Sequence, residues 1–596
     1  MRYIIPLFLT FSLLMAISGC DNKKREQEKK RISDSIEASI PKFLKQYPDF
    51  DMSRLQHAIK TEVETDTTLL PYYLKKNFSS VWFNDTLNIG SLRDLVYTLR
   101  KIEEHGLPAG YFPHVDYITS VTDSVDSGVF VGKMDSLYYE LARLDKVTSR
   151  IMIDYITGMK YGFLCPDSLF FDDYTIKIQR PDSLFYEELY TDIIENPMVA
   201  VVNSHPSDSI YLKMQDEYRW LDSLKNITFT AIKEKGKNFS YKEGDKDKNI
   251  SSIAQRLMVS GEYVPDTLST DSLHQILDQH LLAAVNSFRK KMSYPEDKEI
   301  GDLTIKALNR PFSYYQDRLR ANMERYRWQR VKQRHSKNIE VNIAAFKLFA
   351  TETDSVPLMM NVCVGKPIHK TPMIQSDLSY INLNPKWNIP RSIMRNETVV
   401  LQKRDTTYLK RNRMRVYKGG EEIDPSTIDW KKINPSTFGY LIRQDPGDFN
   451  SLGRIKFMFN NSFSVYLHDT PSKRYFTVKN RAVSHGCVRV QKPLELAFYC
   501  TLPSNDVYKD RLRYSIDRRP VTQEGKKLLG AGKLEKLNDI INLKNKISLF
   551  IDYHTVYMQP DDDILYYADD AYGYDDIILN ALSGIKPVKP KGNKGA

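Results

Sequence analysis

Cysteine is scarce in this sequence, with 5 residues among 596. Apart from Cys20, four remain, an even number that would allow two disulfides in an exported protein, but their spacings do not resemble a disulfide framework. Cys363 and Cys500 lie in apolar runs, so we expect buried thiols that pack as small hydrophobic groups. Cys487 stands among polar neighbours, which makes it the candidate reactive thiol.

A strong excess of one charge is also lacking, because 86 Lys and Arg face 75 Asp and Glu for a net charge of +11. This balance argues against a nucleic-acid-binding protein, although it would favour an anionic polymer. Residues 313–337 are basic with interleaved aromatics, a pattern that some nucleic-acid-binding segments share. We expect instead a linker helix that packs its aromatic side chains on a neighbouring domain, and no nucleic-acid partner.

The apolar run at the N-terminus is short for a membrane span. Residues 1–20 combine Arg2, an apolar core from Ile4 to Ile17, and Ser18-Gly19-Cys20, the pattern of an export signal. A span would need to cross a hydrocarbon core of ~30 Å. Cys20 after Ser-Gly resembles the lipobox of bacterial lipoproteins, in which this Cys is lipidated. We expect an exported lipoprotein facing the periplasm, anchored by lipid in the inner or outer membrane, with a charged tether over 21–40.

The length predicts several domains. Residues 41–250 have mainly helical periodicity, with long helices expected over 135–160 and 210–235 and a helix-stop signature at 105–108. No residue cluster there demands chemistry, so we expect a scaffold domain. Residues 251–312 predict a compact module of three amphipathic helices.

From about residue 338 the periodicity changes from helix to strand, and we expect a mostly β catalytic domain over 338–585. Residues 340–349 alternate like one strand, and late strands over 547–553 and 564–567 are expected to form a hairpin. The charged segment 394–442 interrupts the pattern and predicts a capping insertion. The tail, 586–596, is predicted to be disordered. The fold class is therefore multidomain α+β.

Cysteine attacks as the thiolate, so Cys487 needs a base or a cation nearby. His485 would lie about 7 Å away on the same face of an extended stretch, too far for a hydrogen bond. His468 lies on a separate segment that can pair beside the cysteine segment, and we predict it as the base, oriented by a backbone carbonyl or by Asp469. Gly486 would let the amides of residues 486 and 487 point at an oxyanion, and Arg489 would favour an anionic substrate.

His468, followed by Ser484-His-Gly-Cys-Val-Arg489, resembles the signature of the L,D-transpeptidases with a YkuD-type catalytic domain. The stretches 364–367, 383–390, 443–447, 452–457 and 466–471 resemble the large, YcbB-like branch of that family. That branch joins a helical scaffold, a peptidoglycan-binding module and a capping insertion. Residues 251–312 resemble this module, although Lys290 to Lys298 replace its usual Gly-rich turn.

The resemblance implies that Cys487 attacks the third residue of a tetrapeptide stem and releases D-Ala, with His468 as base and then acid. An amine of a neighbouring stem would resolve the thioester into a 3→3 cross-link, and a carbapenem would acylate the same thiol. Asp469 would orient His468 through its backbone. The remaining pocket residues would be Ser484, His485, Gly486, Arg489 and Tyr466. No cofactor or metal is implied, and the partners would be stem peptides, the membrane through the lipid anchor, and other cell-wall synthesis proteins.

Two alternatives remain open from the sequence. Water could resolve the thioester, which would make the protein an L,D-carboxypeptidase. The chain could also be a non-catalytic wall-binding lipoprotein that uses the module at 251–312.

Overall fold

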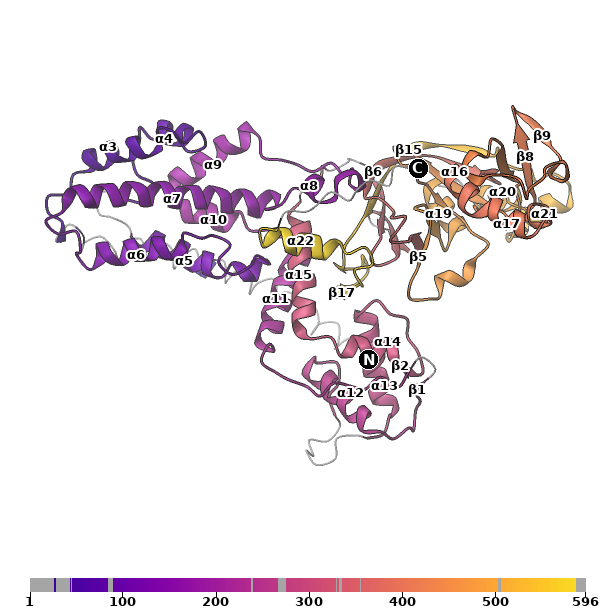
Figure 1. The fold of residues 1–596 in the computed structure, drawn as a ribbon, viewed down its shortest axis with the longest axis horizontal. Helices are drawn as coiled ribbons and strands as arrows, with labels where there is room; N and C mark the ends of the chain where they lie inside the picture. Colours follow the sequence, from indigo (N-terminus) through magenta and orange to yellow (C-terminus); the bar gives the residue numbers. More distant parts are fainter. Residues whose placement is uncertain are drawn as a thin grey trace.

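The computed structural model describes residues 26–27, 43, 46–83, 89–236, 239–265, 275–328, 330–331, 335–353, 355–501 and 505–585. The molecule has three lobes: a long helical lobe, a β-rich lobe at the opposite end, and a small helical lobe below their junction (Figure 1). The predicted signal peptide with Cys20, most of the predicted tether and the predicted tail lie outside the described residues. No helix among the residues described here is long and apolar enough to span a membrane.

The helical lobe is built around the long helix α7, Met134–Tyr161, whose buried face contacts α3, Met52–Val63. The other helices of this lobe are α4 Leu70–Lys75, α5 Ile89–Arg100, α6 Val115–Asp126, α8 Pro166–Phe170, α9 Ser183–Glu195 and α10 Pro197–Asn203. The helix stop at 105–108 is confirmed, since Gly106 has a φ of 81° and ends a short 3₁₀ helix, Ile102–His105. The long helix predicted over 210–235 is wrong at its end, because α11 is Ser209–Ser223.

The small lobe contains the three helices predicted for the module: α12 Lys248–Val259, α13 Gln279–Lys291 and α14 Asp302–Leu308. Two short strands that the sequence did not predict, β1 Ser240–Tyr241 and β2 Ile300–Gly301, pair across the lobe. The helix α15, Phe312–Arg327, then leads from this lobe to the junction with the other two (Figure 1).

Buried charges fasten α15 to the last helix, α22 Tyr574–Leu582. Arg318 and Arg325 both bind the fully buried carboxylate of Asp575, which also accepts a hydrogen bond from the Thr555 hydroxyl at 2.6 Å. A buried carboxylate is tolerated when it is paired and hydrogen-bonded in this way. The C-terminal helix is thereby held at the junction of the lobes.

The β-rich lobe is a nine-stranded sheet of order β13-β5-β14-β12-β11-β6-β15-β3-β4, and an additional pairing of β4 with β5 closes it on itself. Its strands are β3 Lys337–Asn342, β4 Lys347–Glu352, β5 Leu358–Gly365, β6 Ile374–Leu383, β11 Ile455–Phe459, β12 Leu467–His468, β13 Ala482–Ser484, β14 Val488–Val490 and β15 Ile540–Asp552. The helices α19 Pro493–Thr501, α20 Asp506–Ser515 and α21 Gln523–Gly530 follow β14.

Two strand predictions are wrong. Residues 340–349 are a hairpin of β3 and β4 rather than one strand, and Phe346 in its turn has a φ of 53°. The segment 564–567 does not pair with β15; instead β17 Tyr566–Tyr567 pairs with β16 Val556–Tyr557, while β15 lies between β6 and β3. Alternation alone cannot distinguish a strand from a hairpin with a compact turn, or name a strand's partner.

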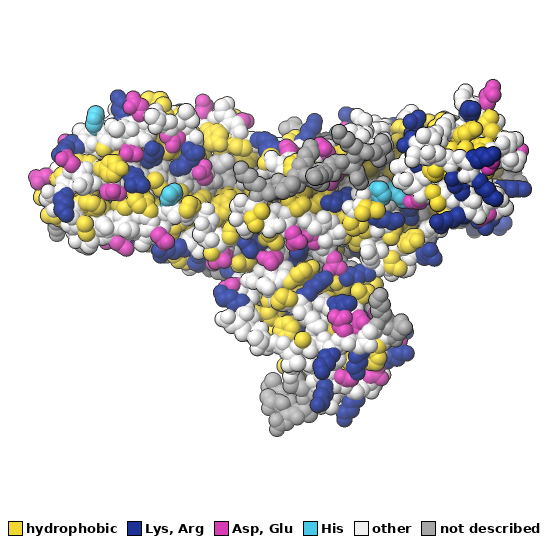
Figure 2. Space-filling view, viewed as in Figure 1, with side chains coloured by type: hydrophobic (Ala, Val, Ile, Leu, Met, Phe, Trp, Pro, Cys, Tyr) yellow, Lys and Arg dark blue, Asp and Glu magenta, His cyan; other side chains and the backbone are white. Residues whose placement is uncertain are grey.

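The segment 387–444, which contains the predicted capping insertion 394–442, has a sheet and a hydrophobic cluster of its own. Its strands are ordered β7-β10-β8-β9, with bounds Trp387–Asn388, Leu441–Gln444, Met414–Lys418 and Glu421–Ile423. Short helices, α16 Arg391–Ile393, a π-helix Met394–Thr398, α17 Val399–Arg404 and α18 Tyr408–Arg411, cover this sheet around buried residues such as Val399, Val416 and Trp430. We call residues 387–444 the cap. Lys and Arg side chains gather at this end of the molecule (Figure 2).

Candidate active site

The cysteine and its predicted base lie on neighbouring strands. The short strand β12 runs parallel to β14, with His468 opposite Arg489, and the Val488 amide donates a hydrogen bond to the Tyr466 carbonyl at 3.1 Å. Cys487 is the residue directly before β14. The pairing that we expected from the sequence therefore exists, and it brings Cys487, His468, Tyr466 and Arg489 to one region of the sheet.

The turn before Cys487 is fixed by hydrogen bonds. Ser484 Oγ donates to the Cys487 carbonyl at 2.6 Å and accepts the Gly486 amide at 3.1 Å. Gly486 has a φ of 112°, a conformation that L residues with a Cβ rarely adopt, and its carbonyl accepts from the Thr371 hydroxyl at 2.7 Å. The expectation that the Gly486 amide faces an oxyanion is thus wrong, because Ser484 already uses that amide. The Cys487 amide has no acceptor among the residues that the structure describes.

His468 is oriented by a backbone carbonyl. Its Nδ1 donates to the Asp469 carbonyl at 2.5 Å, which leaves Nε2 with the free lone pair. The Asp469 carboxylate turns elsewhere and accepts from the Arg454 amide at 2.9 Å and from the Thr470 amide at 2.7 Å. Burial, together with the positive charge of Arg489, lowers the pKa of His468 to about 3. The imidazole is therefore neutral at physiological pH and can accept a proton.

The Cys487 thiol is mostly shielded from solvent, and this burial raises its pKa. Hydrogen bonds from the Tyr466 backbone and hydroxyl, and the charges of Lys456 and Arg489, act in the opposite direction and favour the thiolate. The resting site thus contains a neutral thiol and a neutral imidazole on neighbouring strands. Cys363 and Cys500 are buried as predicted, and burial raises the pKa of Cys363 to about 11.

Lys456 belongs to the site, although no role was predicted for it from the sequence. It lies on β11 directly opposite His468, and its ammonium nitrogen is 3.7 Å from the centroid of the Tyr466 ring. The alternation of β11, with Ile455 and Phe457 buried on either side, is the signal that could have assigned Lys456 to the polar face. The stretch 452–457 alone could not reveal that this face is the one carrying His468.

His485 contacts the cap instead of the cysteine. Its Nε2 lies 2.7 Å from the carboxylate of Glu397, which the π-helix of the cap carries, and its ring stacks on that of His369 with centroids 5.0 Å apart. His485 thus belongs to the contact between cap and sheet. Glu397 and His369 are contact residues that the sequence did not single out. In the part of the chain that the structure describes, no group of His, Cys, Asp and Glu is arranged to hold a metal ion.

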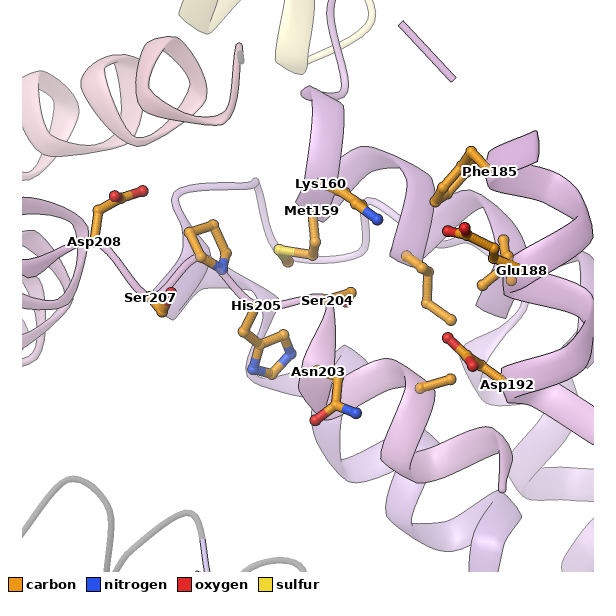
Figure 3. A pocket seen from close by; sticks show the side chains of 14 residues that line it. Met159, Lys160, Phe185, Glu188, Asp192, Asn203, Ser204, His205, Ser207 and Asp208 are labelled. Atoms are coloured by element: carbon orange, nitrogen blue, oxygen red, sulfur yellow. The ribbon is translucent and has the colours of Figure 1, made fainter. Parts of the chain in front are cut away.

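A separate pocket opens in the helical lobe, with a volume of about 420 Å³. Side chains of α7, α9 and α10 line it, among them Lys160, Glu188 and Asp192, and His205 lies on the loop that follows α10 (Figure 3). His205 is hydrogen-bonded to the Tyr155 hydroxyl at 2.8 Å. No cysteine is among the residues that line this pocket.

Two parts of the chain match known domain families. Residues 336–521 match the model of the YkuD L,D-transpeptidase catalytic domain, and residues 67–217 match the model of a scaffold domain. The protein named "Putative L,D-transpeptidase" of Haemophilus influenzae is 38% identical over 160 residues, which cover 27% of this chain and 32% of that protein. The chain thus spans about a third of the length of this curated relative.

Several solved structures also match this chain, among them those of two L,D-transpeptidases. The L,D-transpeptidase of Xylanimonas cellulosilytica is 15% identical, with 43% of this chain and 89% of that chain covered and a TM-score of 0.14. The L,D-transpeptidase of Stackebrandtia nassauensis is 12% identical, with 54% and 97% covered and a TM-score of 0.20.

The β-rich lobe is thus a transpeptidase catalytic domain of the YkuD type, joined to a helical scaffold domain. The match to the L,D-transpeptidase catalytic domain covers residues 336–521, the β-rich lobe, and not the whole chain.

Proposed function

We propose that this protein is an L,D-transpeptidase that forms 3→3 cross-links between peptidoglycan stem peptides through a Cys487 thioester. The observation that carries the proposal is the orientation of His468, whose Nδ1 is bound to the Asp469 carbonyl while burial and Arg489 keep the ring neutral. A neutral imidazole beside a thiol is the pairing that nucleophilic cysteine catalysis requires.

In the first half-reaction, His468 Nε2 takes the proton of the Cys487 thiol, and the sulfur attacks the carbonyl carbon of the third stem residue. The Cys487 amide is a suitable donor to the oxyanion that forms, since the described residues offer it no other acceptor. His468 then returns the proton to the departing amine of D-Ala, and the peptide C–N bond breaks. A thioester between Cys487 and the stem remains.

In the second half-reaction, the side-chain amine of the third residue on another stem attacks the thioester. His468 accepts a proton from this amine and returns it to the sulfur as the C–S bond breaks. Cap and sheet would enclose the reacting groups, which disfavours water as the acceptor.

A substrate rich in carboxylates suits the charges around the site. Arg489 has a buried Nε without a hydrogen-bond acceptor among the described residues. The cap also exposes basic side chains, among them Arg404, Lys410 and Arg411. Stem peptides carry free carboxylates, which such groups bind through charge-assisted hydrogen bonds.

Product analysis tests the proposal and separates the two enzyme alternatives. The protein is incubated with disaccharide tetrapeptides, and the products are separated and weighed by mass spectrometry. We expect cross-linked dimers and free D-Ala from the wild-type protein and neither from Cys487→Ala. Tripeptides without dimers would identify an L,D-carboxypeptidase instead.

The third alternative is a non-catalytic wall-binding protein. It requires an inert Cys487 thiol and retention on peptidoglycan through the module at 251–312. A carbapenem-sized mass increase on the wild-type protein, absent from Cys487→Ala, would exclude it. Binding to isolated peptidoglycan without any mass increase would support it.

We also propose that the protein is an exported lipoprotein, anchored through Cys20 at the inner or outer membrane and facing the periplasm. The motif Ser18-Gly19-Cys20 after an apolar run supports this. Labelled palmitate should enter the wild-type protein in cells and not Cys20→Ala. Equal labelling of both proteins would refute the anchor.

A further inference from the structure

Three polar side chains form a row across three strands of the catalytic sheet. Lys456 on β11 is opposite His468 on β12, and His468 is opposite Arg489 on β14. Residues that are directly opposite in neighbouring strands point to the same face of a sheet. His468, the proposed base, is therefore flanked by a cation on each side. Burial has the largest effect in lowering its pKa to about 3, and both charges act in the same direction.

The two cations of this row lack an anionic partner among the described residues. Some buried cations elsewhere are paired, as Arg327 is with Glu324 at 2.7 Å, whereas others, such as Arg256 and Arg481, bind backbone carbonyls. Among the described residues, no carboxylate forms an ion pair with Lys456 or Arg489. A partly buried cation without an anion is costly, and a negative charge that forms nearby would lower that cost.

Lys456 is connected to the thiol through Tyr466. The ammonium lies over the face of the Tyr466 ring, and burial of Lys456 lowers its pKa. The Tyr466 hydroxyl hydrogen-bonds to Cys487, and its ring meets the His468 ring edge-on with centroids 5.7 Å apart. A cation on the ring face draws electron density from the phenol and makes its O–H a stronger donor.

We propose that Lys456 acts through the Tyr466 ring to stabilise the negative charge that develops on the Cys487 sulfur, which makes it a positioning residue of the reaction. The inference rests on the proposed function, in which Cys487 is the nucleophile. In the step concerned, the thiol proton moves to His468 Nε2, and the sulfur keeps the electron pair. The imidazolium that forms is disfavoured by the flanking cations, so the sulfur anion must be stabilised by groups other than His468.

The charged and titratable groups around this sulfur come from several elements. Tyr466 and His468 are contributed by β12 and the residue before it, Lys456 by β11, and Arg489 by β14. On the cap side, Glu397 is already bound to His485. Of these groups, Lys456 is the one in contact with the Tyr466 ring face.

Alkylation of Cys487 by iodoacetamide tests the role without requiring turnover. The full-length protein is alkylated between about pH 6 and 10, and the modified peptide is quantified by mass spectrometry, since the thiolate is the reacting form. Lys456→Met should slow the alkylation of Cys487 at about pH 8 roughly tenfold. It should also raise the midpoint of the curve of alkylation rate against pH by about one pH unit. Lys456→Arg keeps the charge and should stay close to the wild-type rate.

Two further comparisons locate the effect. Lys544→Met removes an exposed charge from β15 and should leave the alkylation rate and midpoint of Cys487 unchanged. Tyr466→Phe should slow alkylation, and Lys456→Met should add less than about twofold on top of it, because interacting sites are not additive. The peptide with Cys165, on the helical lobe, serves as an internal reference. If Lys456→Met does not fold, Lys456→Gln provides the same comparison.

An unchanged alkylation midpoint in the folded Lys456→Met variant would overturn the inference. Additive losses of alkylation rate in the variant that combines Lys456→Met and Tyr466→Phe would overturn the route through Tyr466. Normal cross-linking with an unchanged midpoint would leave the proposed function standing without this role for Lys456. An absence of cross-linking in the wild-type protein would refute the proposed function whatever the alkylation shows.

Discussion

At the scale of single residues, the site depends on a histidine that stays neutral. Burial and two flanking cations oppose protonation of His468, and the Asp469 carbonyl holds the tautomer with a free Nε2. In the ordinary range of histidine the base would be half-protonated near pH 6.5. Here the base form persists far below that pH.

The pH dependence of acylation follows from this. Because the pKa of His468 is lowered to about 3, the unprotonated base is fully present at every pH well above that value and is lost only as the pH falls through it. The rate of acylation at saturating stem peptide should therefore not decline between about pH 8 and 5. Rapid-quench measurements of thioester formation would check this. A decline with a midpoint near pH 6.5 would contradict it.

Gly453 leaves room for the Asp469 side chain and thereby supports the orientation of the His468 ring. It has a φ of 61°, and a Cβ at this position would lie 2.3 Å from the Asp469 carboxylate. Gly453→Ala should displace Asp469, whose carbonyl orients His468, and should lower the acylation rate by about 10²-fold. Gly419→Ala is the matched control, since its φ is 60° and nothing lies within 4 Å of its Cβ position. Equal acylation rates for the two variants would show that Asp469 tolerates the shift.

The sequence predicted Cys487 and His468 as partners, because a short separate segment can pair beside the cysteine. It could not predict that Lys456 shares their face, since the partner and register of β11 depend on the closed sheet. Nor could it show that Ser484 occupies the Gly486 amide, which depends on a local turn geometry.

At the scale of elements, the cap meets the catalytic sheet through His485 and Glu397. The pair is partly exposed, so its contribution is small, about 1 kcal/mol or less. Glu397→Gln should speed hydrogen exchange in residues 394–411 by about fivefold at most. Glu421→Gln, on β9 at the exposed end of the cap, should leave exchange there unchanged. Unchanged exchange in Glu397→Gln would show that this pair does not hold the cap.

The attachment of α22 to α15 has larger consequences. Asp575→Ala would leave Arg325 buried without a carboxylate, which typically costs about 3–5 kcal/mol, while Arg318 would keep Asp570 at 3.2 Å. The variant should unfold at a clearly lower temperature than the wild type in a thermal scan. Asp576→Ala is the control, because the Asp576 side chain is 70% exposed and reaches only Arg318, at 3.4 Å. Similar melting temperatures for both variants would contradict the importance of the buried network.

The helix periodicity of the scaffold and module was predictable because amphipathic spacing is a local property. The β3–β4 hairpin was not, because its compact turn at residues 343–346 is itself apolar and buried. The pairing of β15 between β6 and β3 joins segments more than 150 residues apart, and no local pattern encodes such contacts.

At the scale of the whole molecule, the two long lobes and the small module meet at α15 and α22, so the catalytic site is held by elements from several parts of the chain (Figure 1). The C-terminal segment reaches the site itself. The Tyr572 hydroxyl donates to the Gly365 carbonyl at 2.6 Å, and Thr371 links Gly365 to Gly486. The scaffold and the module would together present this site to peptidoglycan, the proposed substrate.

The most direct test of the central claim is the mass of the intact protein after brief exposure to a tetrapeptide stem. We expect the wild-type protein to gain the mass of the stem less D-Ala, with the addition located on Cys487 by peptide mapping and absent from Cys487→Ala. A folded wild-type protein that gains no such mass, or that carries the addition on another residue, would contradict the assignment of Cys487 as the nucleophile.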